Sequence, residues 1–226
     1  MRVLRIAATA LSLALVLPLS YAKAAASADI RSTALDVERY LLLYSNGGDE
    51  RFWTQMSEAQ NQLGEQVKAE KGAATLEGIL STYQDYAAKV HAAYHEKNFD
   101  LNTSLSQASE IFNLLDSFIP ADTTNPPPRL SDNLRAFAVL SIRQDTPLAK
   151  ASDQQAIDQL ASDISAQIDA LSTENPKAYQ KVPMRWKYLQ TAQRNGKPLI
   201  YPFNAQIEYM LTQLEKDSAE APRTSL

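Results

Sequence analysis

The chain has 226 residues, of which 45% are hydrophobic and 21% are charged, and it contains no cysteine. The absence of cysteine excludes disulfides, thiolate metal sites, iron–sulfur clusters and cysteine nucleophiles. The 22 Lys and Arg residues against 26 Asp and Glu residues give a net charge of −4, whereas a general nucleic-acid-binding protein carries an excess of positive charge. With six glycines and 11 prolines, turn-forming residues are few, so we expect an all-α fold and no nucleic-acid partner.

The first 24 residues have the pattern of a secretory signal peptide. Arg2 and Arg5 precede an uncharged, mostly apolar run from Ile6 to Leu19, and small residues up to Ala26 offer several cleavage positions. The apolar run is shorter than the roughly 20 residues that cross a bilayer, and no later segment is long and apolar enough to do so. We therefore expect residues 1–24 to be cleaved, a periplasmic or secreted location, and no transmembrane span in the mature chain.

Residues 27–120 are expected to form an N-terminal helical bundle. The segment from Ala34 to Tyr44 is apolar around most of its circumference, so it should lie at the centre of the bundle. Asn46, Gly47 and Gly48 predict the end of that helix. Apolar residues then recur at helical spacing from Phe52 to Val67, from Leu76 to Tyr94 and from Leu105 to Phe118, the last behind a cap at Asn102 or Thr103. Glycines leave open whether the first two of these segments are one bent helix or two.

Residues 121–129 contain Pro126, Pro127 and Pro128, and no regular helix crosses a proline triplet. We expect this segment to be a linker to a C-terminal helical bundle over residues 130–218, followed by a flexible tail at 219–226. Within the second bundle, the pattern predicts a helix from Leu130 to Arg143 with Ser131 in its N-cap, and an amphipathic helix from Asp153 to Leu171. A third helix is predicted from Asn175 to Asn195, and Pro183 kinks or restarts it. An extended segment from Pro198 to Pro202 and a last helix around Ile207 to Leu214 follow.

The predicted fold class is therefore all-α, with two antiparallel helical-bundle halves after a cleaved signal peptide. Each half opens with a short, largely apolar helix that an amphipathic helix follows, and Leu35 to Tyr44 would correspond to Leu134 to Arg143. A duplication explains this similarity, but one continuous bundle of unrelated segments would show the same hydrophobic pattern.

The two histidines of the chain, His91 and His95, are four residues apart within one expected helix. This spacing places both imidazoles on one helix face, an arrangement that suits zinc or copper. No carboxylate stands at the same spacing to give a third ligand, and the intervening residues, Ala92, Ala93 and Tyr94, lack the glutamate of a zinc protease. We expect two histidines that flank the core, with no cofactor, and keep a metal site as the alternative.

Charge changes sign sharply at Pro176. Five acidic residues and no basic ones lie between Ala151 and Pro176, whereas the segment from Lys177 to Ile207 contains only basic charges. Two neighbouring helices could neutralise one another in this way, or the basic segment could face an acidic envelope protein or an anionic envelope component. The apolar segment that follows either packs between helices or contacts the same partner. The candidate partner-binding residues are Lys177, Lys181, Arg185, Lys187, Arg194, Lys197, Tyr201 and Phe203.

No motif for covalent catalysis or phosphate binding occurs in the sequence, since Gly-x-Ser-x-Gly and glycine-rich phosphate loops are both absent. We therefore expect no enzymatic activity. The leading interpretation is an exported, periplasmic, non-catalytic helical-bundle protein that acts as a binding or adaptor module. The alternative is a periplasmic transition-metal-binding protein that uses the pair His91 and His95.

Overall fold

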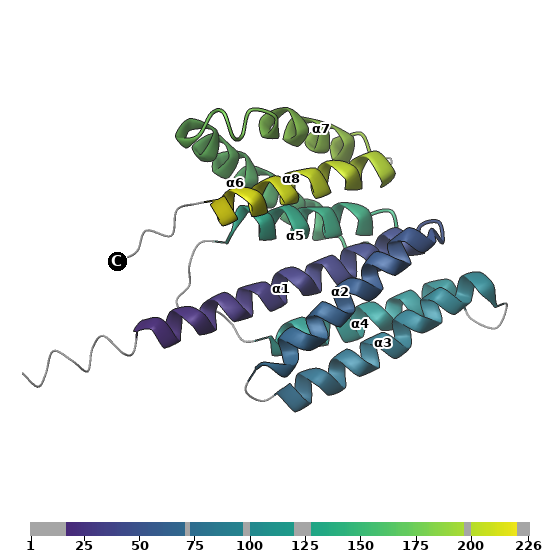
Figure 1. The fold of residues 1–226 in the computed structure, drawn as a ribbon. Coiled ribbons are helices and arrows are strands. Elements are labelled where there is room, and N and C mark those ends of the chain that lie inside the picture. The colour runs from purple at the N-terminus through teal and green to yellow at the C-terminus, as the bar shows by residue number, and fades with distance from the viewer. Residues whose placement is uncertain (1–16, 71–72, 97–99, 120–127, 197–199, 221–226) are drawn as a thin grey trace, which may run out of the picture.

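The structure is a computed structural model that describes the backbone of residues 17–70, 73–96, 100–119, 128–196 and 200–220, with side chains described from 29 to 216 within these ranges. Over these residues the chain forms α-helices and no β-strand, which confirms the all-α prediction (Figure 1). None of the described helices is both long enough and apolar enough to cross a membrane. The helices are α1 (Leu17–Ser45), α2 (Glu50–Lys68), α3 (Ala73–His95), α4 (Leu101–Phe118), α5 (Leu130–Arg143), α6 (Asp153–Glu174), α7 (Val182–Arg194) and α8 (Ile200–Glu220).

Helix α1 occupies the middle of the molecule. It packs against α2, α3 and α4 on one side and against α5 on the other, and α5 in turn packs against α6 and α8 (Figure 1). Val37, Leu41, Leu42 and Leu43 are all buried, as expected of a central helix. The helix is much longer than the pattern from Ala34 to Tyr44 predicts, because it already begins at Leu17.

Several element boundaries differ from the prediction. The segment expected to be extended before Pro202 belongs instead to α8 from Ile200 onwards, and Pro202 is tolerated there because a first-turn N–H has no partner within the helix. Asp100 caps α4 by accepting a hydrogen bond from the backbone N–H of Thr103. Arg129 precedes α5, so Ser131 lies in the first turn and is not the cap.

The structure also bears on two helix starts and on part of the expected linker. Helices α2 and α3 are separate, and Gly64 and Gly78 lie inside them. The helix predicted to start at Asn175 begins only at Val182, with Pro183 in its first turn, because residues 176–181 form turns after α6. Of the expected linker 121–129, residues 121–127 lie outside the described residues, as does the tail from residue 221. The division into two bundle halves therefore stays a prediction.

A buried arginine joins α1 to α8. The side chain of Arg39 is only 1% exposed, and its guanidinium donates to Asn204 at 2.6 Å and pairs with Glu208 at 2.7 Å, both on α8. It also pairs with Asp36 at 2.8 Å, whose other oxygen accepts from Nε of Arg135 on α5 at 2.7 Å. Desolvation lowers the pKa of Arg39, but the neighbouring carboxylates outweigh it and hold that pKa above its ordinary value. These pairs fix the register of α5 and α8 on α1.

The preceding residue on α1, Glu38, carries a buried carboxyl without such pairing. Glu38 is 6% exposed, and its Oε1 has no hydrogen-bond partner among the described residues. Burial raises the pKa of Glu38 to about 7, although Arg143 opposes this rise. The nearby hydroxyl of Tyr83 is also buried without a partner among the residues described. Glu38 is therefore held protonated in the folded chain over a pH range in which an exposed glutamate is ionised.

Glu38→Gln should change how stability depends on pH. The folded protein holds the proton of Glu38 up to about pH 7, whereas the unfolded chain releases it near its ordinary pKa of 4.5. The free energy of unfolding of the wild type should thus fall as pH rises through this window, by roughly 3 kcal/mol relative to the variant. Urea denaturation of both proteins at pH 4.5 and pH 7.5 measures the difference. Parallel pH profiles would show that Glu38 titrates normally.

Candidate metal centre

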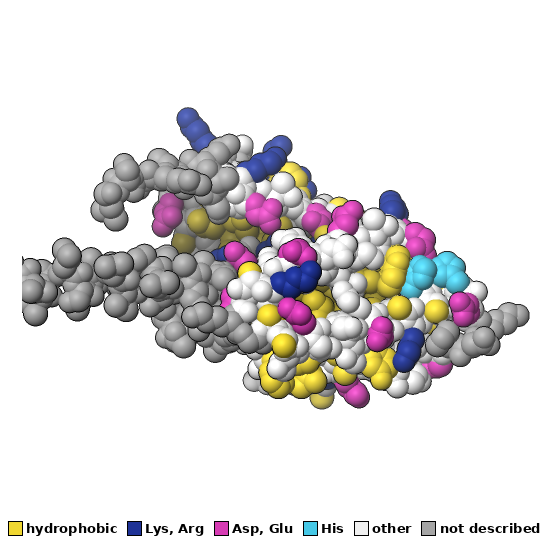
Figure 2. Space-filling view, turned by 60° about the horizontal axis from the view of Figure 1, so that its bottom comes forward, with side chains coloured by type: hydrophobic (Ala, Val, Ile, Leu, Met, Phe, Trp, Pro, Cys, Tyr) yellow, Lys and Arg dark blue, Asp and Glu magenta, His cyan; other side chains and the backbone are white. Residues whose placement is uncertain are grey.

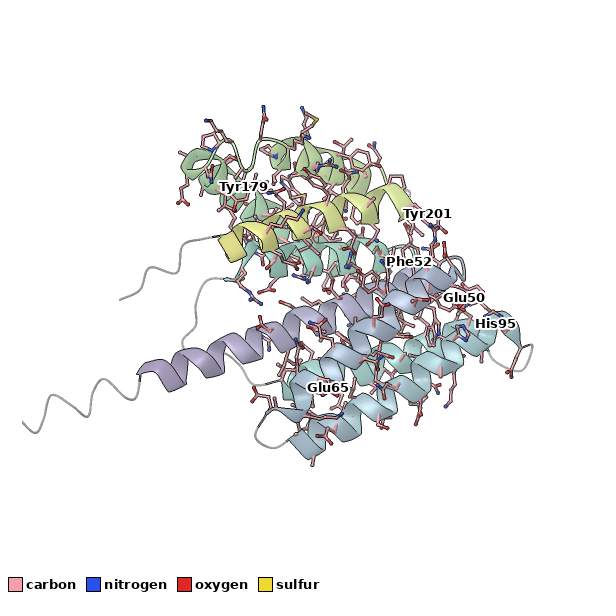
Figure 3. All side chains as sticks on the ribbon, viewed as in Figure 1. Glu50, Phe52, Glu65, His95, Tyr179 and Tyr201 are labelled. Carbon is pink, nitrogen blue, oxygen red and sulfur yellow. The ribbon has the colours of Figure 1, made fainter. Side chains whose placement is uncertain are left out.

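Three side chains from two helices meet at one end of the α2 and α3 pair. Glu50 is the first residue of α2, and His91 and His95 lie in the last two turns of α3. One ligand atom from each lies within 4.8 Å of the others. Nε2 of His91 is 3.2 Å from Oε2 of Glu50, and Nε2 of His95 is 3.1 Å from Oε1 of Glu50. Figure 3 labels Glu50 and His95 at this end of the molecule. One carboxylate therefore faces both imidazoles, and Figure 2 shows the two histidines together at the surface.

The turn between α1 and α2 places Glu50 beside α3. Gly48 has a φ of +66°, which reverses the chain, and Asp49 then caps α2 by accepting the backbone N–H of Arg51 at 2.9 Å. The hydroxyl of Tyr94 on α3 donates to the carbonyl oxygen of Ser45 at 2.6 Å. Since these contacts tie the turn to the last part of α3, the start of α2 is held next to the two histidines.

Aromatic rings support the inner side of this site. The imidazole of His91 stacks against Trp53, with 4.4 Å between ring centroids, and against Tyr44 at 5.5 Å. Tyr44 is fully buried, and its hydroxyl donates to Oε1 of Glu50 at 3.4 Å. The side chains of His91, His95 and Glu50 are 30%, 53% and 55% exposed, respectively. The site thus has a packed aromatic wall and an open side toward solvent.

Two imidazole nitrogens and one carboxylate oxygen form a ligand set that zinc proteins use, with a fourth position left for water. Zinc bonds of about 2.0–2.1 Å in a tetrahedral arrangement require neighbouring ligand atoms to be about 3.3 Å apart. The two nitrogen-to-oxygen distances, 3.2 Å to Oε2 and 3.1 Å to Oε1, are close to that value but involve different oxygens of Glu50, and the ligand atoms lie within 4.8 Å of one another. Copper(II) also accepts this mixture of nitrogen and oxygen ligands. The residues therefore offer a suitable ligand set for a divalent transition ion, and the side chains would draw closer together to bind it.

The electrostatics of Glu50 favour its ionised form. Partial desolvation raises the pKa of this carboxyl, but hydrogen bonds from His91 and His95 outweigh that effect, and the pKa lies below its ordinary value. An ionised carboxylate is the form that coordinates a metal. An ionised carboxylate can only accept, so each imidazole donates its Nε2 proton to Glu50. To bind a metal ion through Nε2, each neutral imidazole would take the tautomer that carries the proton on Nδ1.

The sequence revealed the histidines but not Glu50, which lies 41 residues before His91. No carboxylate stands at helical spacing from the two histidines on their own helix, so the third ligand comes from another helix. A usable signal was present, because two helices joined by a short connection run antiparallel. The start of α2 and the end of α3 therefore lie side by side, and an acidic residue at the first position of α2 reaches the last turns of α3.

The residues predicted to bind a partner lie elsewhere and have different environments. Lys177, Lys181, Lys187 and Arg194 are exposed on or next to α7, and Lys197 lies outside the described residues. Arg185 lies over the ring of Tyr209 at 3.5 Å from its centroid and donates to Gln206. Phe203 is fully buried and hence unavailable to a partner. Among the described residues no ion pair joins α6 to α7, although the change in charge sign suggested one.

Tyr201 combines exposure with packing. It is 53% exposed, yet its ring stacks on Phe52 at 5.6 Å between centroids. Its hydroxyl donates to Asp49 at 2.5 Å, so α8 contacts the cap of α2 immediately beside Glu50. Tyr201 is therefore a contact between α8 and α2, and not part of the basic surface of α7.

Gly48→Ala should disturb both the fold and the metal centre. A Cβ at this position would lie 2.7 Å from a ring carbon of Tyr94, and the φ of +66° is unfavourable for alanine. We expect the free energy of unfolding to drop by about 1–3 kcal/mol, and Tyr94 to shift together with the neighbouring histidines. Urea denaturation gives the first quantity. Gly47→Ala is the matched control, since no atom lies within 4 Å of its added Cβ; equal stabilities for the two variants would contradict this account of the turn.

No protein-family model matches this chain, and neither the curated proteins nor the solved structures include one with significant similarity to it.

Proposed function

We propose that this protein binds a divalent transition-metal ion, zinc or copper(II), through Glu50, His91 and His95. The observation that supports the proposal is the convergence of one carboxylate from α2 on two imidazoles from α3, with nitrogen-to-oxygen distances of 3.1 and 3.2 Å. This geometry favours the metal-binding interpretation of the sequence over the general adaptor interpretation. The proposal concerns metal binding without catalysis, because the glutamate that a zinc protease places between its histidines is replaced by alanine.

The predicted signal peptide adds a location to this proposal. An exported protein meets zinc and copper outside the cytoplasm, and a site with three ligands and an open side suits reversible uptake there. The site should also respond to acid, since protons compete with the metal for both imidazoles. We propose, accordingly, a periplasmic or secreted metal-binding protein.

The packing order of the helices supports the proposed division into bundles over 27–120 and 130–218. In the first four helices, each helix packs against the next one in the chain, and α4 packs back against α1, which closes a cycle. Helices α5 to α8 form a second cycle in the same way, because α8 packs back against α5. The packing of α1 on α5, together with the contacts of α8 with Arg39 and Phe52, then joins the two cycles. In this arrangement the metal centre belongs entirely to the first bundle.

Calorimetric titration with zinc chloride tests the proposal. We expect one ion to bind per chain, and we expect the affinity to fall at least about tenfold in His91→Ala, His95→Ala and Glu50→Gln, because each variant removes one of three ligands. Glu58→Gln is the matched control, since Glu58 is an exposed carboxylate on the same helix outside the site. Unchanged binding in all three ligand variants would reject the site. Loss of binding in the histidine variants alone would remove Glu50 from it.

A further inference from the structure

The exposed side of α7 forms a second surface with its own chemistry. We define the outer face of α7 as Lys181, which precedes the helix, together with Met184, Lys187, Tyr188, Thr191 and Arg194. Val182, Trp186 and Leu189 are buried on the opposite side, where α7 packs against α6 and α8. Met184, Lys187, Tyr188 and Thr191 follow the spacing of one helix face. Figure 1 shows α7 at the edge of the molecule that lies farthest from α3.

Large apolar side chains on this face are open to solvent. Met184 is 75% exposed and Tyr188 is 41% exposed, and Met184 is the most exposed of the large hydrophobic residues described. Exposed apolar side chains that occur singly need no explanation, but these two lie one turn apart on one helix, with Lys181, Lys187 and Arg194 on the same face. The combination is that of an amphipathic surface with apolar residues inside a basic rim.

The charge on this face is unbalanced. No acidic residue occurs between Lys177 and Ile207, although the whole chain carries a net charge of −4. Within the described residues, Lys181, Lys187 and Arg194 have no carboxylate partner. No described acidic residue of α6 forms an ion pair with them, so their charged groups can reach an external anion. The outer face lies along one helix at an edge of the molecule. Such a face can lie against a flat surface, whereas a bound peptide would need a groove.

We propose that the outer face of α7 docks on an anionic phospholipid surface. Met184 and Tyr188 enter the boundary between headgroups and acyl chains, where the tyrosine hydroxyl stays hydrated, and Lys181, Lys187 and Arg194 contact phosphate groups. An interaction of this kind requires anionic lipid and weakens as salt screens the charges. It is independent of the metal centre, which lies on α2 and α3.

A fluorescent probe on the outer face tests this directly, because the chain has no cysteine and a single introduced one is labelled specifically. Met184→Cys carries an environment-sensitive dye, and Leu114→Cys on α4 carries the same dye as control, since Leu114 is also an exposed apolar residue at 44%. Both proteins are mixed with vesicles of phosphatidylglycerol or phosphatidylcholine. We expect a blue shift for the Met184→Cys probe with phosphatidylglycerol alone, its loss in 0.5 M salt, and no shift for the Leu114→Cys probe.

Charge reversal completes the test. Adding Lys187→Glu to the Met184→Cys protein should weaken vesicle binding at least about threefold, whereas Lys68→Glu, an exposed lysine on α2, should leave it unchanged. All variants share the same N-terminus, so the apolar run at residues 6–19 cannot produce a difference between them. No shift at the Met184→Cys probe, an equal shift at the Leu114→Cys probe, or insensitivity to Lys187→Glu would overturn the proposal. If the outer face binds an acidic protein and not a membrane, the vesicles should cause no shift at the Met184→Cys probe.

Discussion

The packing of this molecule depends on the pairing of charges that α1 carries into the interior. Arg39 is almost completely buried, so its charge must be met by hydrogen-bonded carboxylates, and Asp36 and Glu208 supply them at 2.8 and 2.7 Å. Asp36 in turn holds Arg135 of α5 at 2.7 Å. Since an unpaired buried charge is far more costly than a lost apolar contact, α5 and α8 have little freedom to slide along α1. Apolar packing alone would not define their register as strictly.

The position of α1 also determines the metal centre. Tyr44, near its C-terminal end, stacks on His91, and the following turn delivers Glu50 to the start of α2. Asp49 in that turn accepts hydrogen bonds from Arg51 and from Tyr201, which together hold the pKa of its carboxyl below the ordinary range. The turn is therefore anchored by α3 through Tyr94 and by α8 through Tyr201. The site occupies the point where these contacts converge, which explains how exposed ligands can keep a defined arrangement.

The sequence predicts the helices well where apolar periodicity is continuous, as in α2 and α6, because each buries one face. The prediction fails where a local preference is overridden by tertiary packing. Pro202 suggested an extended segment, but this part of the chain is helical in α8, where Phe203 and Asn204 are buried. The histidine pair was visible because both ligands lie on one helix. Glu50 was not, because its position depends on the Gly48 turn and on how α2 packs against α3, and both are properties of the tertiary structure.

Anomalous X-ray diffraction from crystals grown with zinc would test the central claim most directly, because it locates the ion and its ligands without relying on affinity. The account predicts one strong anomalous peak about 2.0–2.2 Å from Nε2 of His91, Nε2 of His95 and a carboxylate oxygen of Glu50. Water should occupy the remaining position on the solvent side. A zinc ion bound at other residues, or a peak that touches the histidines while Glu50 points away, would contradict it.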